Sequence, residues 1–346
     1  MQRKKTKKIK IGNVFIGGGE PILIQSMLDR PFDNIQANIE QAQELEKAGC
    51  QMLRVAVPNS RAVELINILK RYISIPVIAD IHFDYNIAIK SIHAGADKIR
   101  INPGNIEKNN LLKIANICSQ KNIPIRIGIN NGSVNKKFLA KYSNSADAMV
   151  ASAKEIIDLF ENFGFDKIIV SLKSSNIYKT IEAYEKMSKI CDYPMHIGIT
   201  EAGTENYGII KSCVGIGSLL TRGIGDTIRV SLSANHVKEI EVGYQILKSL
   251  GLRDCVEVVS CPTCGRCTLD VKQLALEIEN FTKNIRKKLK IAVMGCPVNG
   301  PGEARDADFA ITGAHGTGLI FRKGEIIKRV PQNKLLEELK KLIFEL

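Results

Sequence analysis

Tryptophan is absent from this chain of 346 residues, and aromatic residues make up only 5% of it. So few aromatic side chains leave little from which to build stacking platforms for single-stranded nucleic acid. No apolar run reaches the roughly 18–20 residues that a membrane-spanning helix needs. The first residues are basic and no apolar block follows them, so no secretory signal is visible. These absences predict a cytoplasmic protein that binds neither a membrane nor nucleic acid.

Negative charge is also in short supply. The 49 lysines and arginines outnumber the 36 acidic residues and leave a formal net charge of +13. An excess of this size favours an anionic partner. Part of it lies in Gln2–Lys10, which we expect to be a solvated tail.

The nine cysteines do not suggest a disulfide framework. Their number is odd, and five of them fall between Cys255 and Cys296. Clustered thiols in a chain without a secretory signal are typical of a metal or cluster site in a reducing compartment.

Short β-branched runs alternate with amphipathic helical stretches from residue 20 to about residue 250. This alternation predicts right-handed βαβ units, and eight of them make a (β/α)8 TIM barrel over residues 1–252 that binds the substrate. A doubly wound open sheet is the alternative. Residues 253–346 have a different texture and predict a small α+β domain that carries the cysteine cluster. The eight predicted strands are Ile22–Ser26, Met52–Val57, Val77–His82, Lys98–Asn102, Ile125–Asn130, Ile168–Lys173, His196–Thr200 and Ile228–Ser233.

Polar and charged residues occupy the inward positions of these strands. Outward positions are apolar, as helix-facing positions of a barrel should be. Each desolvated, unpaired cation costs several kcal/mol or more. We expect Asp80 and Glu201 to offset two of the cations, and a bound anion to neutralise the others. The inward positions hold Arg54, Asp80, His82, Arg100, Asn102, Arg126, Asn130, Ser171, Lys173, Arg229 and Ser231.

Guanidinium groups match phosphate oxygens two at a time, so this pattern predicts a pocket for a small, multiply phosphorylated substrate. Internal ion pairing is the alternative. Glu201 shares the parity of apolar Ile197 and Ile199, so it reaches the barrel mouth only if the strand ends or bulges near Thr200. Otherwise it is a loop carboxylate. His82 is expected to form hydrogen bonds in the pocket.

The cysteines in the second domain have ligand spacing. Cys261 and Cys264 form a CxxC pair, Cys267 follows at the same spacing, and Cys296 lies further on. Soft thiolates suit Zn²⁺ and iron–sulfur clusters alike. A zinc ribbon usually has a second CxxC, which Cys296 lacks, so the spacing favours an iron–sulfur site. Spacing leaves open whether Cys255, Cys267 or a non-cysteine group completes the coordination.

Several longer strings resemble one family, the bacterial 4-hydroxy-3-methylbut-2-enyl diphosphate synthases of the non-mevalonate isoprenoid pathway. The likeness runs in one collinear order from about Ile22 to Gly324. The strings that carry it are Ala79–Tyr85, Lys98–Asn105, Gly223–Ser231, Ser260–Cys264 and Asn299–Glu303.

The resemblance implies reductive ring opening of 2-C-methyl-D-erythritol 2,4-cyclodiphosphate with two electrons. It implies a 4Fe–4S cluster, flavodoxin or ferredoxin as electron donor, and a head-to-tail homodimer. The implied cluster ligands are Cys261, Cys264, Cys296 and Glu303, and Glu201 is implied in proton transfer. The implied substrate contacts are Arg54, Arg100, Asn102, Arg126, Asn130, Lys173, Arg229 and Ser231, to which the inward pattern adds Asp80 and His82.

Two other functions compete with this one. A phosphosugar isomerase or aldolase with a structural zinc module would have a similar barrel. A basic nucleic-acid-binding protein with a zinc knuckle would explain the net charge but not the arginines inside the strands. Cys267 is an extra thiol beside the predicted ligand loop, so a CxxCxxC ligand set is a further possibility.

Overall fold

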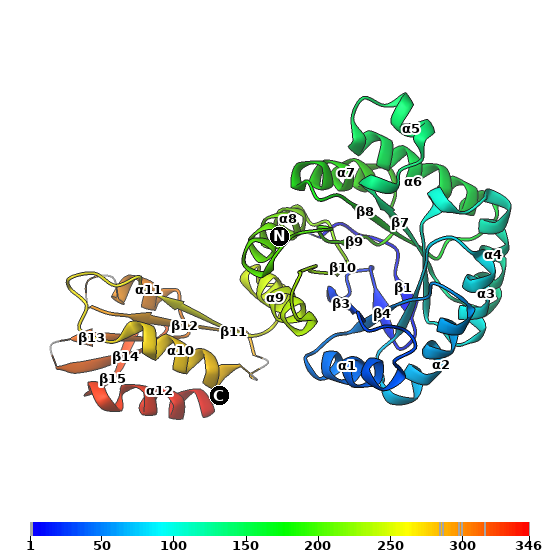
Figure 1. Ribbon diagram of the computed structural model, residues 1–346. Helices are drawn as coiled ribbons and strands as arrows, with labels where there is room; N and C mark the ends of the chain where they lie inside the picture. The colour runs from blue at the N-terminus through cyan, green and yellow to red at the C-terminus, as the bar shows by residue number, and fades with distance from the viewer. Residues whose placement is uncertain are drawn as a thin grey trace. The chain divides into compact units, whose positions relative to one another are not determined.

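The computed structural model describes residues 3–283, 285, 287–296, 298, 300–314 and 316–345. The chain divides into two compact units, Met1–Leu250 and Gly251–Leu346 (Figure 1). Within the described part of the chain, each helix is too short or too polar to traverse a lipid bilayer.

The first unit is a parallel barrel. Its eight-stranded sheet has the order β8-β7-β6-β5-β4-β3-β10-β9. A bridge between Val170 and Met195 joins the two ends of this order, so the predicted (β/α)8 barrel is confirmed. The strands are β3 (Leu23–Met27), β4 (Met52–Ala56), β5 (Val77–Ile81), β6 (Lys98–Ile101), β7 (Ile125–Asn130), β8 (Ile168–Lys173), β9 (His196–Ile197) and β10 (Thr227–Ile228).

Helices surround these strands (Figure 1). Many of them begin at an asparagine or aspartate whose side chain accepts a hydrogen bond from the first turn, as Asn34, Asn144, Asn176 and Asn235 do. Such a cap satisfies one of the free backbone N–H groups at the helix start. The helices are α1 (Ile35–Lys47), α2 (Val63–Tyr72), α3 (Tyr85–His93), α4 (Lys108–Lys121), α5 (Lys136–Lys141), α6 (Ser145–Asn162), α7 (Ile177–Ile190), α8 (Glu205–Thr221) and α9 (His236–Ser249), with short 3-10 turns η1 (Ser60–Ala62), η2 (Pro103–Asn105) and η3 (Asn131–Ser133).

Strands β9 and β10 are shorter than predicted. The predicted strands reached Thr200 and Ser233, whereas regular pairing ends at Ile197 and Ile228. The two chains come unusually close there, because a Cβ atom on Gly198 would lie 2.3 Å from the carbonyl oxygen of Arg229. This close approach replaces regular pairing with an irregular segment that leads into the barrel mouth.

The amino-terminal segment closes the opposite end of the barrel. Strands β1 (Ile9–Ile11) and β2 (Val14–Ile16) form an antiparallel hairpin that the sequence patterns did not predict. Ile9, Ile11 and Ile16 are buried against residues at the starts of the barrel strands, including Met52 and Ile78. They form an apolar floor beneath the charged interior.

The expectation of a solvated basic tail was wrong. Arg3 forms an ion pair with buried Asp226 at 3.2 Å, and the hydroxyl of Thr6 donates to the same carboxylate at 3.0 Å. The other oxygen of Asp226 accepts from the backbone N–H of Met195 at 2.9 Å. A buried carboxylate needs such partners. Residues 3–8, which we call the amino-terminal strap, supply two of them.

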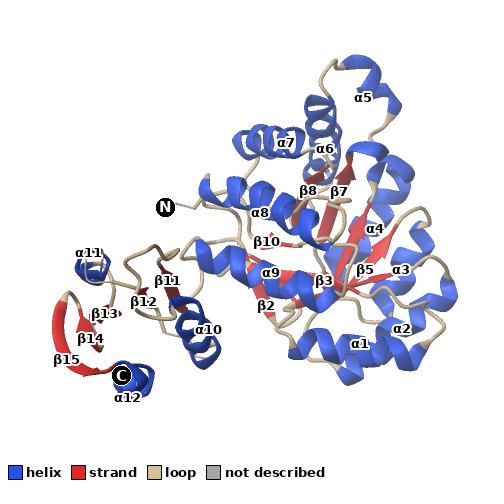
Figure 2. Ribbon diagram, turned by 60° about the vertical axis from the view of Figure 1, so that its left-hand side comes forward, coloured by secondary structure: helices blue, strands red, loops and turns tan. Residues whose placement is uncertain are grey.

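The second unit has a five-stranded sheet in the order β11-β12-β13-β14-β15. The first three strands are parallel and the last three antiparallel. Helices α10 and α12 pack on one face and α11 on the other (Figure 2). The elements are β11 (Val256–Ser260), α10 (Val271–Thr282), β12 (Leu289–Met294), α11 (Gly300–Arg305), β13 (Phe309–Ala314), β14 (Thr317–Arg322), β15 (Glu325–Pro331), η4 (Gln332–Lys334) and α12 (Leu335–Phe344).

Strand β15 was missed by the sequence patterns. It is an edge strand that is exposed along most of its length, so it lacks the buried apolar alternation by which strands are recognised. The other four strands of this unit are each at least partly buried. His315 lies outside the described residues.

The strap makes a stability prediction. Asp226→Ala leaves the N–H of Met195 and the hydroxyl of Thr6 without their buried acceptor, so we expect the free energy of unfolding to fall by about 2–4 kcal/mol. Urea unfolding measures this change. Asp192→Ala is the control, because the exposed Asp192 makes only a 3.8 Å ion pair with Lys7 and should change stability by less than about 0.5 kcal/mol. Equal losses in the two variants would contradict the role of the strap.

Candidate functional site

Cations dominate the interior of the barrel. Alternation along β4, β6, β7 and β8 turns the predicted inward residues toward the axis, and Arg100, Arg126 and Lys173 are buried there. Arg54 and Arg229 are partly buried, with about an eighth to a seventh of each side chain accessible. Lys98 is a sixth cation, fully buried one layer below Arg100.

Asp80 on β5 is the carboxylate at the centre of this group. It forms ion pairs with Arg100, between Nη1 and Oδ1 at 3.1 Å, and with Arg54, between Nε and Oδ2 at 3.6 Å. The imidazole Nε2 of His82 lies 3.2 Å from Oδ2. Burial alone would raise the pKa of Asp80, but Arg54, His82 and Arg100 together hold it well below its usual range. Asp80 therefore stays ionised and orients two guanidinium groups.

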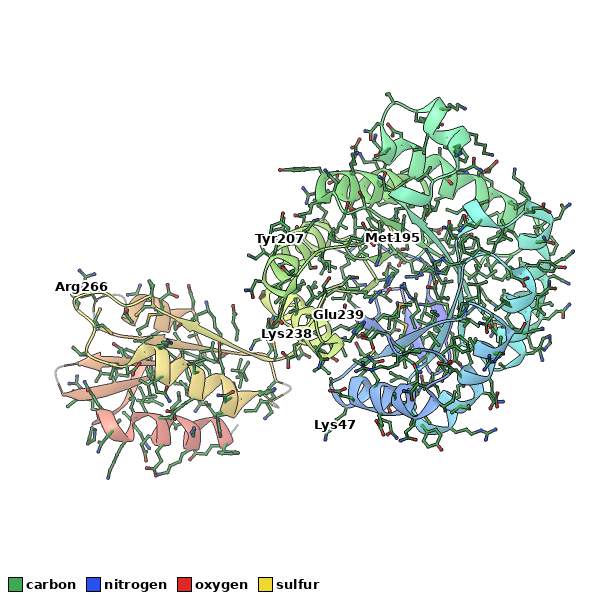
Figure 3. All side chains as sticks on the ribbon, in the orientation of Figure 1. Lys47, Met195, Tyr207, Lys238, Glu239 and Arg266 are labelled. Carbon is green, nitrogen blue, oxygen red and sulfur yellow. The ribbon has the colours of Figure 1, made fainter. Side chains whose placement is uncertain are left out.

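The second carboxylate is Glu239, not Glu201 as we had expected. Glu239 is buried on α9 (labelled in Figure 3), and its Oε2 lies 3.6 Å from Nε of Arg229. It also accepts from the backbone N–H of Leu232 at 2.9 Å. Strand alternation could not reveal this partner, since it comes from a helix on the outside of the barrel. Glu201 makes no ion pair with these cations in the described part of the chain.

Two carboxylates do not balance six basic side chains. Across the described barrel, residues 3–250, buried N–H groups without a hydrogen-bond acceptor include Nε of Arg100, Nε of Arg229, and both Nε and Nη1 of Arg126. Burial lowers the pKa of Arg54 to about 10. Burial and then the neighbouring cations hold the pKa values of Arg126 and Lys173 well below their usual ranges. Buried N–H groups of cationic side chains that lack an acceptor favour a ligand whose oxygen atoms accept hydrogen bonds and carry negative charge.

Two glycines make room for this cluster. A Cβ atom on Gly128 would lie 2.5 Å from Nε of Arg100, and one on Gly198 would lie 2.8 Å from Nζ of Lys173. The guanidinium group of Arg100 also donates to the carbonyl of Gly128 at 3.1 Å. Each of these glycines leaves room for a basic side chain from another strand. Its own local sequence therefore gave no sign of this role.

The remaining predicted contacts surround the barrel mouth. Asn102 is buried and Asn130 and Ser231 are half-buried, at or beyond the carboxyl ends of their strands. The side chain of His82 is 47% exposed, so it forms part of the rim. In the described barrel, Asn130 and Ser231 make no side-chain hydrogen bond to the cations.

Glu201 follows β9 in an unusual backbone conformation. Its φ of +52° lies in the left-handed region, which residues other than glycine seldom adopt. The strand has ended before it, as a position at the mouth requires, and its side chain is exposed. The backbone beyond it is held by a hydrogen bond from Ser233 N–H to the carbonyl of Gly203 at 3.0 Å.

Two cysteines of the second unit lie at the carboxyl ends of neighbouring strands. Cys261 follows β11 and Cys296 lies just beyond β12, and these two strands are parallel neighbours. The backbone N–H of Gly295 lies 3.3 Å from Sγ of Cys261. Backbone donors aimed at sulfur are a regular feature of iron–sulfur sites, so the ends of these strands suit thiolate ligation. Thr263, at φ +65°, turns the chain between Cys261 and Cys264.

Cys267 is used differently. Its thiol donates to the carbonyl of Leu269 at 3.1 Å and packs on the apolar core of the unit. A Cβ atom on Gly295 would lie 2.2 Å from this sulfur. Cys264 and Glu303 are exposed. Over the described residues, no three histidine, cysteine or acidic side chains lie close enough together to share a metal ion.

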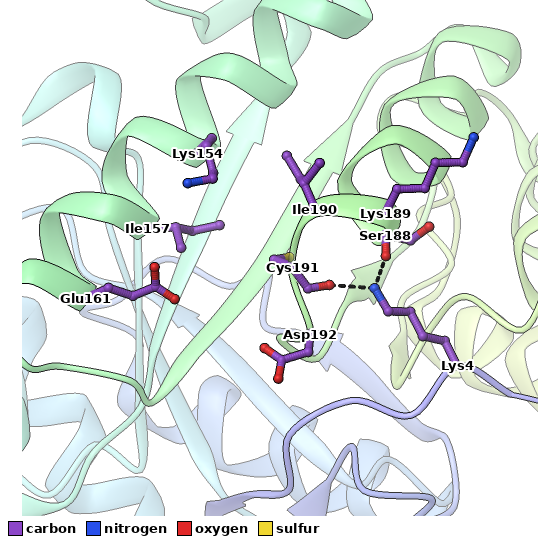
Figure 4. Close-up of a pocket in the computed structure, with 9 residues that line it drawn as sticks. All are labelled: Lys4, Lys154, Ile157, Glu161, Ser188, Lys189, Ile190, Cys191 and Asp192. Atoms are coloured by element: carbon purple, nitrogen blue, oxygen red, sulfur yellow. Dashed lines mark hydrogen bonds between the residues drawn. The ribbon is translucent and has the colours of Figure 1, made fainter.

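Two surface cavities have none of the predicted site residues in their lining. One, of about 450 Å³, is lined by residues of α6 and α7 and by Lys4, whose amine donates to the carbonyls of Ser188 and Cys191 (Figure 4). The other, of about 380 Å³, lies between residues 103–111 and Asn135, Lys137 and Glu155. The first cavity is lined in part by Lys4 of the amino-terminal strap, and none of the basic residues inside the barrel lines it.

Comparisons with known proteins match both units. The model of the GcpE TIM-barrel domain matches residues 6–244, and that of the GcpE protein C-terminal domain matches residues 257–345. The 4-hydroxy-3-methylbut-2-en-1-yl diphosphate synthase (flavodoxin) of Caldanaerobacter subterraneus subsp. tengcongensis is 54% identical over 99% of this chain and 97% of that protein. The protein of the same name from Fusobacterium nucleatum is 51% identical, over 99% and 98%.

Solved structures resemble the chain in fold. Dihydropteroate synthase from Xanthomonas albilineans has a TM-score of 0.52 at 10% identity and covers 71% of this chain and 98% of its own. The Yersinia pestis enzyme has a TM-score of 0.51 at 15% identity, with coverage of 70% and 98%. At such low identity the likeness shows the fold alone.

The glycine cradle makes a binding prediction. Gly128→Ala forces Arg100 out of its place beside Asp80, so we expect the affinity for inorganic pyrophosphate to fall about tenfold or more. Isothermal titration calorimetry measures the affinity. Gly132→Ala is the control, since a Cβ atom there would meet nothing within 4 Å. Unchanged binding by folded Gly128→Ala protein would show that Arg100 takes no part in holding the anion.

Proposed function

The chain belongs to the GcpE family, and from this premise we propose how its two units carry out the family's reaction. It is an oxidoreductase of the non-mevalonate isoprenoid pathway, a 4-hydroxy-3-methylbut-2-en-1-yl diphosphate synthase like its curated relatives. It reduces 2-C-methyl-D-erythritol 2,4-cyclodiphosphate to 4-hydroxy-3-methylbut-2-enyl diphosphate. Two electrons are consumed together with protons: the ring opens as one carbon–oxygen bond breaks and its oxygen stays on the diphosphate, and a second carbon–oxygen bond breaks as a hydroxyl group leaves as water.

The observation that supports substrate binding in the barrel is the excess of buried donors. Arg100, Arg126 and Arg229 have buried N–H groups without a hydrogen-bond acceptor in the described barrel, and Arg54 and Lys173 lie in the same interior. The cyclic diphosphate brings phosphate oxygens that accept these hydrogen bonds bidentately. A neutral sugar would leave the same donors unpaired, and this cost favours the diphosphate.

The other predicted residues contact the ring from the mouth. Asn102, Asn130, Ser231 and His82 hydrogen-bond to the sugar hydroxyls and bridging oxygens, and Asp80 holds Arg54 and Arg100 in place. Glu201, exposed at the end of β9, supplies a carboxyl group for proton transfer to the departing oxygen. General acid catalysis of this kind requires a group within hydrogen-bonding reach of that oxygen.

Members of this family are iron–sulfur enzymes. We assign a 4Fe–4S cluster to Cys261, Cys264, Cys296 and Glu303, a cluster that supplies electrons one at a time when bound. The N–H of Gly295 directed at Sγ of Cys261 supports thiolate at that position. A carboxylate is a harder ligand than a thiolate, so Glu303 is the ligand most easily displaced. Cys267, whose thiol donates to the carbonyl of Leu269, is left out of the set.

Electrons come from flavodoxin, the donor that the names of the curated relatives specify. We place the reaction in the cytoplasm, where thiols stay reduced. None of the nine cysteines, all within the described residues, forms a disulfide.

The working form is a head-to-tail homodimer in which the second unit of one chain closes the barrel of the other. Helix α9 starts beside Asp29 at the carboxyl end of the barrel, and its Tyr244 donates to the carbonyl of Gly49 at the amino end. It thus carries the chain away from the mouth. Only residues 250–255 separate α9 from β11. This linker is about 20 Å long at full extension, and α9 itself is about 21 Å long. The linker would need its full extended length to bring the second unit back to the barrel mouth of the same chain.

Metal analysis tests the cluster assignment. After anaerobic purification we expect about four irons and four sulfides per chain, and Cys261→Ser to lose most of both. Glu303→Ala should retain the thiolate ligands and its iron but lose turnover by about 100-fold. Cys267→Ala is the matched control and should keep its iron. A colourless protein that carries zinc, or a fully active Glu303→Ala variant, would rule the assignment out.

Subunit complementation tests the dimer. Arg126→Ala removes a barrel contact and Cys261→Ser removes a cluster ligand, so each chain alone should be inactive. Unfolding and refolding the two together gives heterodimers with one intact barrel facing one intact cluster, and about a quarter of wild-type activity should return by random pairing. Wild-type chains run through the same procedure provide the reference. No recovery, or a fully active monomer, would refute head-to-tail pairing.

A further inference from the structure

A buried histidine lies beneath the amine of Lys173. Its Nε2 is 3.3 Å from Nζ of Lys173, and its Nδ1 is 2.8 Å from the hydroxyl oxygen of Thr227. His196 and Thr227 are register partners on β9 and β10, and neither side chain is accessible to solvent. The lysine is thus hydrogen-bonded to a pair of side chains that solvent does not reach.

These distances fit two arrangements of the protons. In the first, a charged Lys173 donates to Nε2, and Nδ1–H donates to Thr227. In the second, the hydroxyl of Thr227 donates to Nδ1, and Nε2–H donates to a neutral Lys173 amine. Imidazole can exchange its donor and acceptor nitrogens. Each arrangement satisfies both ring nitrogens, so Lys173 keeps its hydrogen bond in either charge state.

The surroundings favour the neutral amine in the empty barrel. Arg54, Lys98, Arg100, Arg126 and Arg229 face this pair, and the carboxylate of Asp80 on β5 is engaged by two arginines. Burial and then these cations lower the pKa values of Lys173 and His196 well below their usual ranges. Tyr184 on α7 contributes only its hydroxyl, which donates to the backbone carbonyl of His196 at 2.5 Å.

An anion changes the balance. A diphosphate beside Lys173 favours the ammonium form, which donates both to a phosphate oxygen and to Nε2. Gly198 leaves the space in which the amine meets that oxygen, since a Cβ atom there would lie 2.8 Å from Nζ.

We propose that His196 is a positioning residue that reverses its two hydrogen bonds when a diphosphate binds, so that Lys173 is neutral in the empty barrel and a charged donor in the occupied one. One proton enters from solvent on binding and ends on Lys173, while His196 keeps one ring proton and Thr227 keeps its hydroxyl proton. The proposal rests on the diphosphate site of the proposed function. It explains how the fold tolerates a lysine among arginines without a carboxylate of its own.

Nitrogen NMR of the full chain, labelled with ¹⁵N-histidine, tests the reversal directly. The signal of His196 is identified by its loss in His196→Gln. With inorganic pyrophosphate as the probe, we expect the ring proton to move from Nε2 to Nδ1. An unchanged tautomer, or an imidazolium in either state, would overturn the proposal while leaving pyrophosphate binding intact. No binding by the wild type at all would overturn the diphosphate site as well.

Calorimetry of two variants separates this role from a structural one. His196→Gln has an amide that can donate or accept, so its affinity for pyrophosphate and the pH dependence of that affinity should stay within about threefold of wild type. His196→Leu offers neither, and its affinity should fall about tenfold with a flatter pH profile. Tyr184→Phe is the control: it weakens the support of β9 but should keep the pH profile. A wild-type pH profile in folded His196→Leu would contradict the proposal.

Discussion

The structure depends on an electrostatic imbalance held inside the barrel. In the described barrel, six basic side chains share an interior with two carboxylates, and several guanidinium nitrogens lack a hydrogen-bond acceptor. Such an interior costs folding free energy until an anion enters. Other features reduce that cost: Asp80 and Glu239 pair with arginines, and the thioether of Met27 lies 2.8 Å from Nη2 of Arg54. The apolar floor built from the amino-terminal hairpin adds the burial that the charged layer cannot provide.

The alternation of residues along the strands was enough to predict most of this interior. Period two placed Arg54, Arg100 and Arg126 inside, and the eight repeats predicted the barrel that contains them. It could not reveal Glu239, because the partner of Arg229 comes from a helix whose own pattern concerns the outside of the sheet. The role expected of Glu201 as an offsetting charge failed for the same reason: a charge balance depends on contacts between distant segments.

The amino-terminal segment illustrates the limit of composition. A run of lysines and arginines is most often a solvated tail. Here, however, Arg3 forms an ion pair with the buried carboxylate of Asp226, and the hydroxyl of Thr6 donates a hydrogen bond to it. In the second unit, spacing alone left Cys267 equivalent to its neighbours. Its hydrogen bond distinguishes it, because the thiol of Cys267 donates to the carbonyl of Leu269, while Sγ of Cys261 accepts from the backbone N–H of Gly295.

The claim on which this account rests is that the barrel is built for an anion with several phosphate oxygens. The most direct test is the free energy of unfolding of the chain as inorganic pyrophosphate is added, compared with sodium chloride at the same ionic strength. A ligand that binds only the folded state stabilises it in proportion to the logarithm of its concentration above the dissociation constant. The account predicts that each tenfold increase in pyrophosphate concentration above the dissociation constant raises the free energy of unfolding by the same increment. Sodium chloride should cause no such increase. Equal effects of the two salts would contradict it.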